Sequence, residues 1–178
     1  AEASRNTVIS AHVSNWWNDV SQEYEQDETD PYSAYAKTIL LHWANRITFA
    51  HIIKSRQNAA MMIDQLDYST SPEEADGMFQ SITQRSDFFN IFASMEYAVY
   101  LPKLSWQDLV EYSLFLRDSG MEDMPQTVLQ SILEGSVTLA RRVLNGQFTT
   151  PPVLAGILAE ITVRNWEDDV LDCCCGTG

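Results

Sequence analysis

Basic side chains are scarce in this chain of 178 residues. Lys and Arg number 11 against 25 Asp and Glu, which gives a formal net charge of −14 at pH 7 and a pI of about 4.4. Acidic residues are in excess both in the first 70 positions and in the remainder. Nucleic-acid binding normally rests on Lys and Arg that neutralise phosphates. We therefore expect that this segment by itself binds neither DNA nor RNA, nor a membrane surface.

Cysteine is rarer still, and the only three are Cys173, Cys174 and Cys175. Neighbouring residues do not easily reach disulfide geometry, and no further cysteine is available as a partner. Three consecutive thiols also suit a single tetrahedral ion poorly, and no second CxxC pair exists. The sequence thus predicts no metal site, and its cysteine usage is typical of a reducing cytoplasm.

Long hydrophobic runs are missing as well. No stretch approaches the ~18 apolar residues that a membrane-spanning helix needs, and the first residues, AEASRNTVIS, lack the pattern of a signal peptide. We expect a cytoplasmic protein with no membrane partner. Glycine and proline are few, at seven and six, which leaves room for long helices.

Helical periodicity dominates what is present. Apolar residues recur at steps of three and four through most of the chain before residue 165. The spacing predicts helices over about 6–25, 30–65, 71–85, 105–120, 125–145 and 151–163. The second of these should bend or break near Ser55–Asn58, where the apolar stripe lapses. The fold class that follows is mainly α, a helical bundle.

Three helix starts can be read from local signals. Asp30-Pro31 and Ser71-Pro72 each place a capping side chain before a proline in the first turn. Ser105 with Asp108 forms a third capping pair. The aromatic run at residues 88–92 is expected to lie in the core.

The last part of the chain differs from the rest. A polar loop and a Thr-Pro helix start, NGQFTTP, are followed by an apolar helix and then by VLDCCCGTG. Val170-Leu171 reads as a short strand that runs into a glycine turn. In α/β folds such a turn brings backbone N–H groups close to a polar ligand, and an acid at the strand end can bind an amine or hydroxyl. No Gly-Lys-Ser/Thr sequence is present, which excludes a P-loop.

With these two segments in place, the sequence resembles the N6-adenine DNA methyltransferases of restriction–modification systems, most closely the type I modification subunits. In that family a Gly-Gln-aromatic-aromatic-Thr-Pro segment precedes an Asp-Pro-x-Cys-Gly-x-Gly turn, and both bind S-adenosylmethionine. Thr149 replaces the second aromatic and Cys173 replaces the proline. The resemblance implies that the cofactor-binding residues are Gln147, Phe148, Thr150, Pro151, Asp172, Cys175, Gly176 and Gly178.

The resemblance also implies a domain organisation. Residues 1–145 would form an N-terminal helical domain, and residues 146–178 would open a Rossmann-like methyltransferase domain that is incomplete here. The full-length parent would use S-adenosyl-L-methionine to methylate adenine N6 in double-stranded DNA, with a specificity subunit as a further partner. The catalytic Asn/Asp-Pro-Pro-aromatic motif of the family has no match in this chain. We therefore assign no catalytic residue and expect the fragment itself to be inactive.

Two other functions stay open. The chain could be a non-enzymatic helical protein-interaction module with an unrelated tail, or the methyltransferase could act on RNA or on protein glutamine. In the methyltransferase interpretation, the helix at 151–163 would bury its apolar face against a sheet that this chain does not include, so we expect that face to need a partner surface here. We expect that face to pack on the bundle or on a second copy of the chain, which would give a homodimer.

Overall fold

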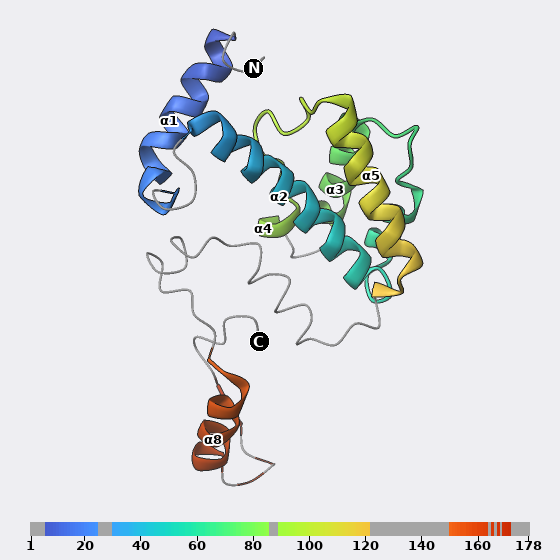
Figure 1. Ribbon diagram of the computed structural model, residues 1–178. Helices are drawn as coiled ribbons and strands as arrows, with labels where there is room; N and C mark the ends of the chain where they lie inside the picture. The colour runs from blue at the N-terminus through green and yellow to red at the C-terminus, as the bar shows by residue number, and fades with distance from the viewer. Residues whose placement is uncertain are drawn as a thin grey trace.

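The structure, a computed structural model, describes residues 6–24, 30–85, 89–121, 150–163, 165, 167 and 169–171. This part of the chain is mainly helical, as predicted (Figure 1). The elements are α1 (Thr7–Tyr24), α2 (Pro31–Ile53), the 3-10 helix η2 (Asn58–Gln65), α3 (Pro72–Gln84), α4 (Phe89–Phe92), α5 (Lys103–Asp118) and α8 (Pro152–Thr162). The helix expected over 125–145 lies outside the described residues.

Two of the predicted helix starts are confirmed in atomic detail. The Asp30 carboxylate accepts hydrogen bonds from the Ser33 backbone N–H at 2.9 Å and from its hydroxyl at 2.7 Å. Ser71 and Glu74 form a reciprocal capping box at the start of α3. Each cap satisfies backbone donors that have no partner inside the helix.

The third predicted start is wrong. Helix α5 begins at Lys103 after Pro102, and no side chain caps it. The backbone N–H of Trp106 already bonds to the Pro102 carbonyl at 3.0 Å, so Ser105 lies inside the first turn. The Trp106 indole N–H donates to the Thr70 carbonyl at 2.7 Å. We attribute the earlier start to this tertiary contact, which a local capping pattern does not reveal.

The break predicted near Ser55–Asn58 is present. Helix α2 ends at Ile53, whose carbonyl accepts from Arg56 at 2.9 Å and from Gln57 at 2.8 Å. The chain then reverses into η2, which contributes Ala60 and Ile63 to the core alongside α2. The lapse in the apolar stripe thus marks a turn rather than a bend within one helix.

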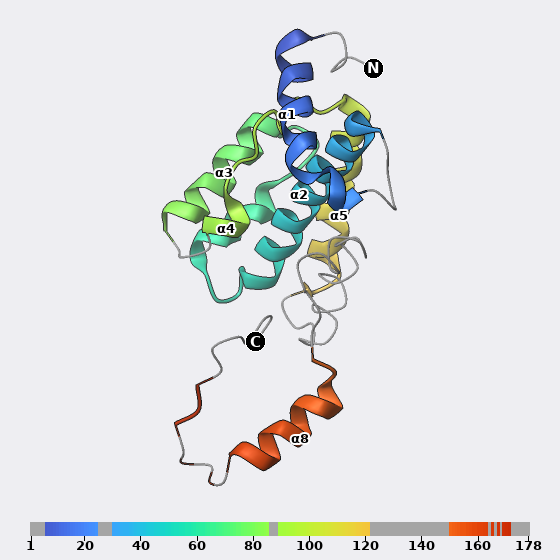
Figure 2. The same cartoon turned by 90° about the vertical axis from the view of Figure 1, so that its left-hand side faces the viewer.

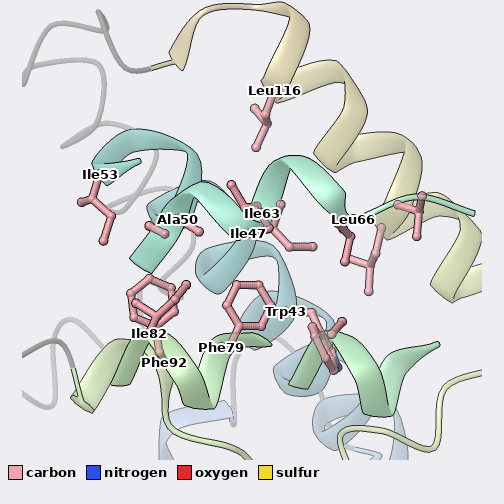
Figure 3. Packing of buried hydrophobic residues seen from close by; sticks show 14 of the residues in the cluster. Trp43, Ile47, Ala50, Ile53, Ile63, Leu66, Phe79, Ile82, Phe92 and Leu116 are labelled. Carbon is pink, nitrogen blue, oxygen red and sulfur yellow. The ribbon is translucent and has the colours of Figure 1, made fainter. Parts of the chain in front are cut away.

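The core is built around α2, with η2, α3, α4 and α5 packed against it (Figure 3). Aromatic rings occupy its centre, as expected for Phe92. Phe79 and Phe92 stack at a centroid distance of 5.6 Å, and Trp43 meets Trp106 edge-on at 5.1 Å. Burial of such side chains is the main source of stability in a domain of this size.

Helix α1 lies beside the N-terminal half of α2, at one end of the bundle (Figures 1 and 2). Val13 is buried there, and Trp16 packs edge-on against Tyr35 at 5.0 Å. Tyr24 exchanges a hydrogen bond with Thr38 at 2.8 Å. These contacts form a small cluster of their own beside the central core.

Helix α8 lies away from the bundle in both views (Figures 1 and 2). Its apolar side chains are exposed, namely Val153, Leu154, Ile157, Leu158 and Ile161. The expectation that this face packs on the bundle is therefore wrong for the described residues. Packing on a second copy stays a prediction.

The expected strand at Val170-Leu171 is not formed in the described part of the chain. Residues 169–171 have no regular secondary structure, and Val170 and Leu171 are 65% and 85% exposed. A strand is stabilised by hydrogen bonds to a neighbouring strand, and none of the described segments offers one.

Candidate functional site

Two of the eight residues assigned to cofactor binding lie in the described part of the chain. Thr150 and Pro151 are exposed and stand directly before α8. The other six lie outside the described residues, namely Gln147, Phe148, Asp172, Cys175, Gly176 and Gly178. The domain boundary at 145/146 also lies outside the described residues.

The start of α8 has an open geometry. Pro151 is extended, with φ −54° and ψ 138°, and its carbonyl accepts from the Ala155 N–H at 3.0 Å. No side chain caps the helix. The N–H groups of a helical first turn point out of the helix and carry partial positive charge. A polar or anionic group of a ligand could bind there, in line with the role that the resemblance gives Thr150 and Pro151.

A polar cluster that the sequence did not reveal lies inside the bundle. The Arg46 side chain is fully buried on α2 and forms a 2.8 Å ion pair from Nη1 to Oδ1 of Asp76 on α3. Its guanidinium contacts two rings, 4.9 Å from the centroid of Trp43 and 4.4 Å from that of Phe79. The second Asp76 oxygen accepts from Gln80 at 2.8 Å and from Ser94 at 2.6 Å.

Burial and pairing act against each other in this cluster. Burial raises the pKa of Asp76, but hydrogen bonds from Ser94 and Arg46 outweigh it, so the pKa lies below its ordinary value. Burial lowers the pKa of Arg46, and Asp76 partly offsets the shift. Burial, together with the Arg46 charge, lowers the pKa of His42 to about 4. At neutral pH the cluster is an ion pair beside a neutral imidazole.

We interpret the Arg46 cluster as structural. Its carboxylate oxygens are occupied by Arg46, Gln80 and Ser94, and its cation is covered by aromatic rings. A substrate would need an exposed face, which this arrangement does not offer. The sequence signal that could have pointed to it is an arginine in the middle of an apolar helix stripe, since an unpaired charge is not tolerated there.

A second polar cluster lies at the surface where α1, α2 and the turn at residues 96–99 meet. His12 Nε2 lies 2.9 Å from the Tyr35 hydroxyl, and His12 Nδ1 lies 3.3 Å from a Glu96 carboxylate oxygen. The Tyr35 hydroxyl donates to the Glu96 carbonyl at 2.9 Å. Tyr97 packs edge-on against the His12 ring at 4.9 Å and has a positive φ of 60°. These residues come from three distant segments, so no spacing in the sequence indicates them.

Among the described residues there is no group of three His, Cys, Asp or Glu placed to hold a metal ion. No helix in the described part of the chain combines the length and apolarity needed to cross a membrane.

Comparison with protein-family models, with curated proteins and with solved structures gave no match.

Proposed function

We propose that this chain is the N-terminal part of an S-adenosylmethionine-dependent DNA adenine-N6 methyltransferase. The observation that carries the proposal is the succession of NGQFTTP, an apolar helix and VLDCCCGTG within the last 34 residues. In the proposed enzyme Thr150 and Pro151 open a helix beside the cofactor, and Asp172 binds an amine or hydroxyl of it. The backbone at Gly176 and Gly178 approaches the ligand closely.

Helix α8 supports this proposal. It begins one residue after Pro151, where the motif predicts a helix start, and it runs for 11 residues. Its large apolar side chains recur at steps of three and four residues, which places them on one face, and they are exposed. A helix of this kind is typical of α/β folds, in which helices cover a sheet. In the proposed enzyme α8 packs on the sheet of the cofactor-binding domain.

The charge of the chain is compatible with the proposed cofactor. S-adenosylmethionine carries a sulfonium cation, and an acidic site favours it over a triphosphate. Because residues 1–178 carry an excess of acidic side chains, DNA contacts are assigned to other parts of the parent enzyme. A specificity subunit is the partner that the resemblance adds.

Calorimetric titration of the natural gene product that contains this sequence tests the cofactor site. We expect S-adenosylmethionine to bind, and Asp172→Ala to weaken binding by about 10- to 100-fold, because a hydrogen bond to a charged group is lost. Asp169→Ala is the matched control, since Asp169 is an exposed acid three positions away. Equal effects of the two substitutions would contradict the assigned role of Asp172.

A non-enzymatic helical interaction module is the second candidate. The observation that favours it is the exposed apolar face of α8, because such a face commonly marks a contact with another protein surface. In this case the gene product would bind no S-adenosylmethionine, and substitutions in α8 would disrupt an assembly instead of a cofactor site.

A further inference from the structure

The turn that follows α4 is held in place by side chains of α2. The Tyr35 hydroxyl donates to the Glu96 carbonyl at 2.9 Å, and the Trp43 indole N–H donates to the Ala98 carbonyl at 2.8 Å. Both donors belong to buried side chains. Because the carbonyls on both sides of Tyr97 are bound in this way, the backbone of the turn is fixed, and so is the direction in which Tyr97 leaves it.

Tyr97 has a backbone conformation that is rare for its residue type. Its φ of 60° lies in the left-handed region, which glycine adopts freely and which is unfavourable for a residue with a large side chain. In this conformation its ring packs edge-on against His12 at 4.9 Å and lies 6.3 Å from the ring of Tyr100. Desolvation and a hydrogen bond with the Glu96 side chain raise the pKa of its hydroxyl. The strained turn thus brings two phenol rings and a carboxylate together.

This group of side chains is largely open to solvent. Tyr100 is 72% exposed, the Glu96 side chain is 64% exposed, and Tyr97 is half-buried. The uncovered ring faces carry partial negative charge, and they lie beside an anionic group. Both features attract a cation, the rings through their faces and the carboxylate through charge-assisted hydrogen bonds.

We propose that the surface formed by Glu96, Tyr97 and Tyr100 binds an arginine side chain of a basic partner protein. Arginine fits this surface better than lysine does, because its planar guanidinium stacks on an aromatic ring while its N–H groups pair with a carboxylate. The charge of the chain favours such a partner, since 25 acidic residues outnumber 11 basic ones. The surface belongs to the helical bundle and is independent of the proposed cofactor site.

NMR titration of residues 1–178 with a short blocked peptide of alternating Gly and Arg tests the proposal. The same peptide with Lys in place of Arg carries the same charge and is the control. At about 0.15 M ionic strength distant charges are screened. We expect the Arg peptide to shift the amide signals of residues 96–100 and to bind at least about two-fold more tightly than the Lys peptide. Equal affinities, or shifts spread evenly over the acidic surface, would overturn the proposal.

Substitutions identify the side chains responsible. Tyr100→Ala should weaken binding of the Arg peptide by about two- to five-fold, the range of an exposed contact between a cation and a ring. Glu96→Gln should weaken it by a similar factor, because the anion is lost. Tyr68→Ala and Glu111→Gln are the matched controls, at an exposed tyrosine and an exposed acid elsewhere on the bundle, and should leave the affinity unchanged.

All four substituted positions are exposed, so the variants should fold, and unchanged signals of α5 verify this. Full affinity in Tyr100→Ala or in Glu96→Gln would overturn the proposal, as would equal losses in the controls. Two other occupants have their own signatures. Shifts of residues 96–100 on dilution without peptide would assign the surface to a second copy of the chain. Tetramethylammonium that binds as tightly as the Arg peptide would assign it to a small organic cation. Either result would overturn the proposal.

Discussion

At the scale of single residues, Arg46 and Asp76 join α2 to α3 inside the bundle. Their side chains form an ion pair of 2.8 Å, and the Arg46 guanidinium contacts the rings of Trp43 and Phe79. Asp76 also accepts a hydrogen bond from Ser94. A buried pair of this kind adds little net stability over an apolar replacement. Removal of one partner is different, because it leaves the other charge buried without compensation.

We expect Asp76→Ala to lower the free energy of unfolding by about 3–5 kcal/mol, because the Arg46 guanidinium would stay buried without its anionic partner. Arg46→Met in combination with Asp76→Ala should recover part of that loss, because no buried charge remains. Urea denaturation monitored by circular dichroism measures both variants. A loss below about 1 kcal/mol in Asp76→Ala would show that Arg46 is not held by this pair.

His42 gives a pH dependence whose sign is fixed by its environment. Burial and the Arg46 charge lower its pKa to about 4 in the folded protein, against about 6.5 in an unfolded chain. Between these values the unfolded state binds the extra proton, so the free energy of unfolding falls as the pH is lowered from about 6.5 to 4. The contribution of Asp76, whose folded pKa is lowered, is lost only at lower pH, starting near its unfolded value of about 4.

We therefore expect His42→Gln to flatten the stability profile between about pH 6.5 and 4. In the unsubstituted protein, the pKa shift of His42 lowers the free energy of unfolding by roughly 2–3 kcal/mol over this pH range, and the variant should lack this decrease. Chemical denaturation at a series of pH values measures it. An unchanged slope in the variant would contradict the neutral state of the half-buried His42.

At the scale of elements, helix ends that depend on neighbouring residues can be predicted from the sequence, whereas contacts between distant segments cannot. The starts at Asp30 and Ser71 and the break after Ile53 follow from capping residues and from the apolar stripe, which are local signals. The start at Ser105 was predicted wrongly, because α5 begins earlier, after Pro102. The clusters around Arg46 and His12 join distant segments, and a single sequence holds no signal for such pairs.

Ser71 and Ser105 allow a direct test of which predicted helix cap is present. Ser71→Ala removes the side chain that accepts from the Glu74 N–H, so it should cost about 0.5–2 kcal/mol of stability. Ser105→Ala is the matched comparison, because α5 has no side-chain cap, and it should change stability by less than about 0.5 kcal/mol. Thermal and urea denaturation measure both. Equal losses would contradict the helix boundaries described above.

At the scale of the whole molecule, α8 is a helix that is exposed to solvent although it is rich in apolar side chains. The sequence predicts that the apolar face of this helix packs on a second copy of the chain, which would give a homodimer. Analytical ultracentrifugation of residues 1–178 should show a concentration-dependent dimer that Ile157→Glu abolishes. Glu160→Gln on the same helix is the control. A monomer at all concentrations, with α8 ordered, would contradict this expectation.

The central claim concerns the enzyme to which this chain contributes its first cofactor motif. The most direct test incubates the natural gene product with DNA and labelled S-adenosylmethionine and identifies the methylated base by mass spectrometry. The account predicts N6-methyladenine in double-stranded DNA, reduced strongly by Asp172→Ala and unaffected by Asp169→Ala. No methyl transfer to DNA under conditions in which the gene product is folded would contradict it.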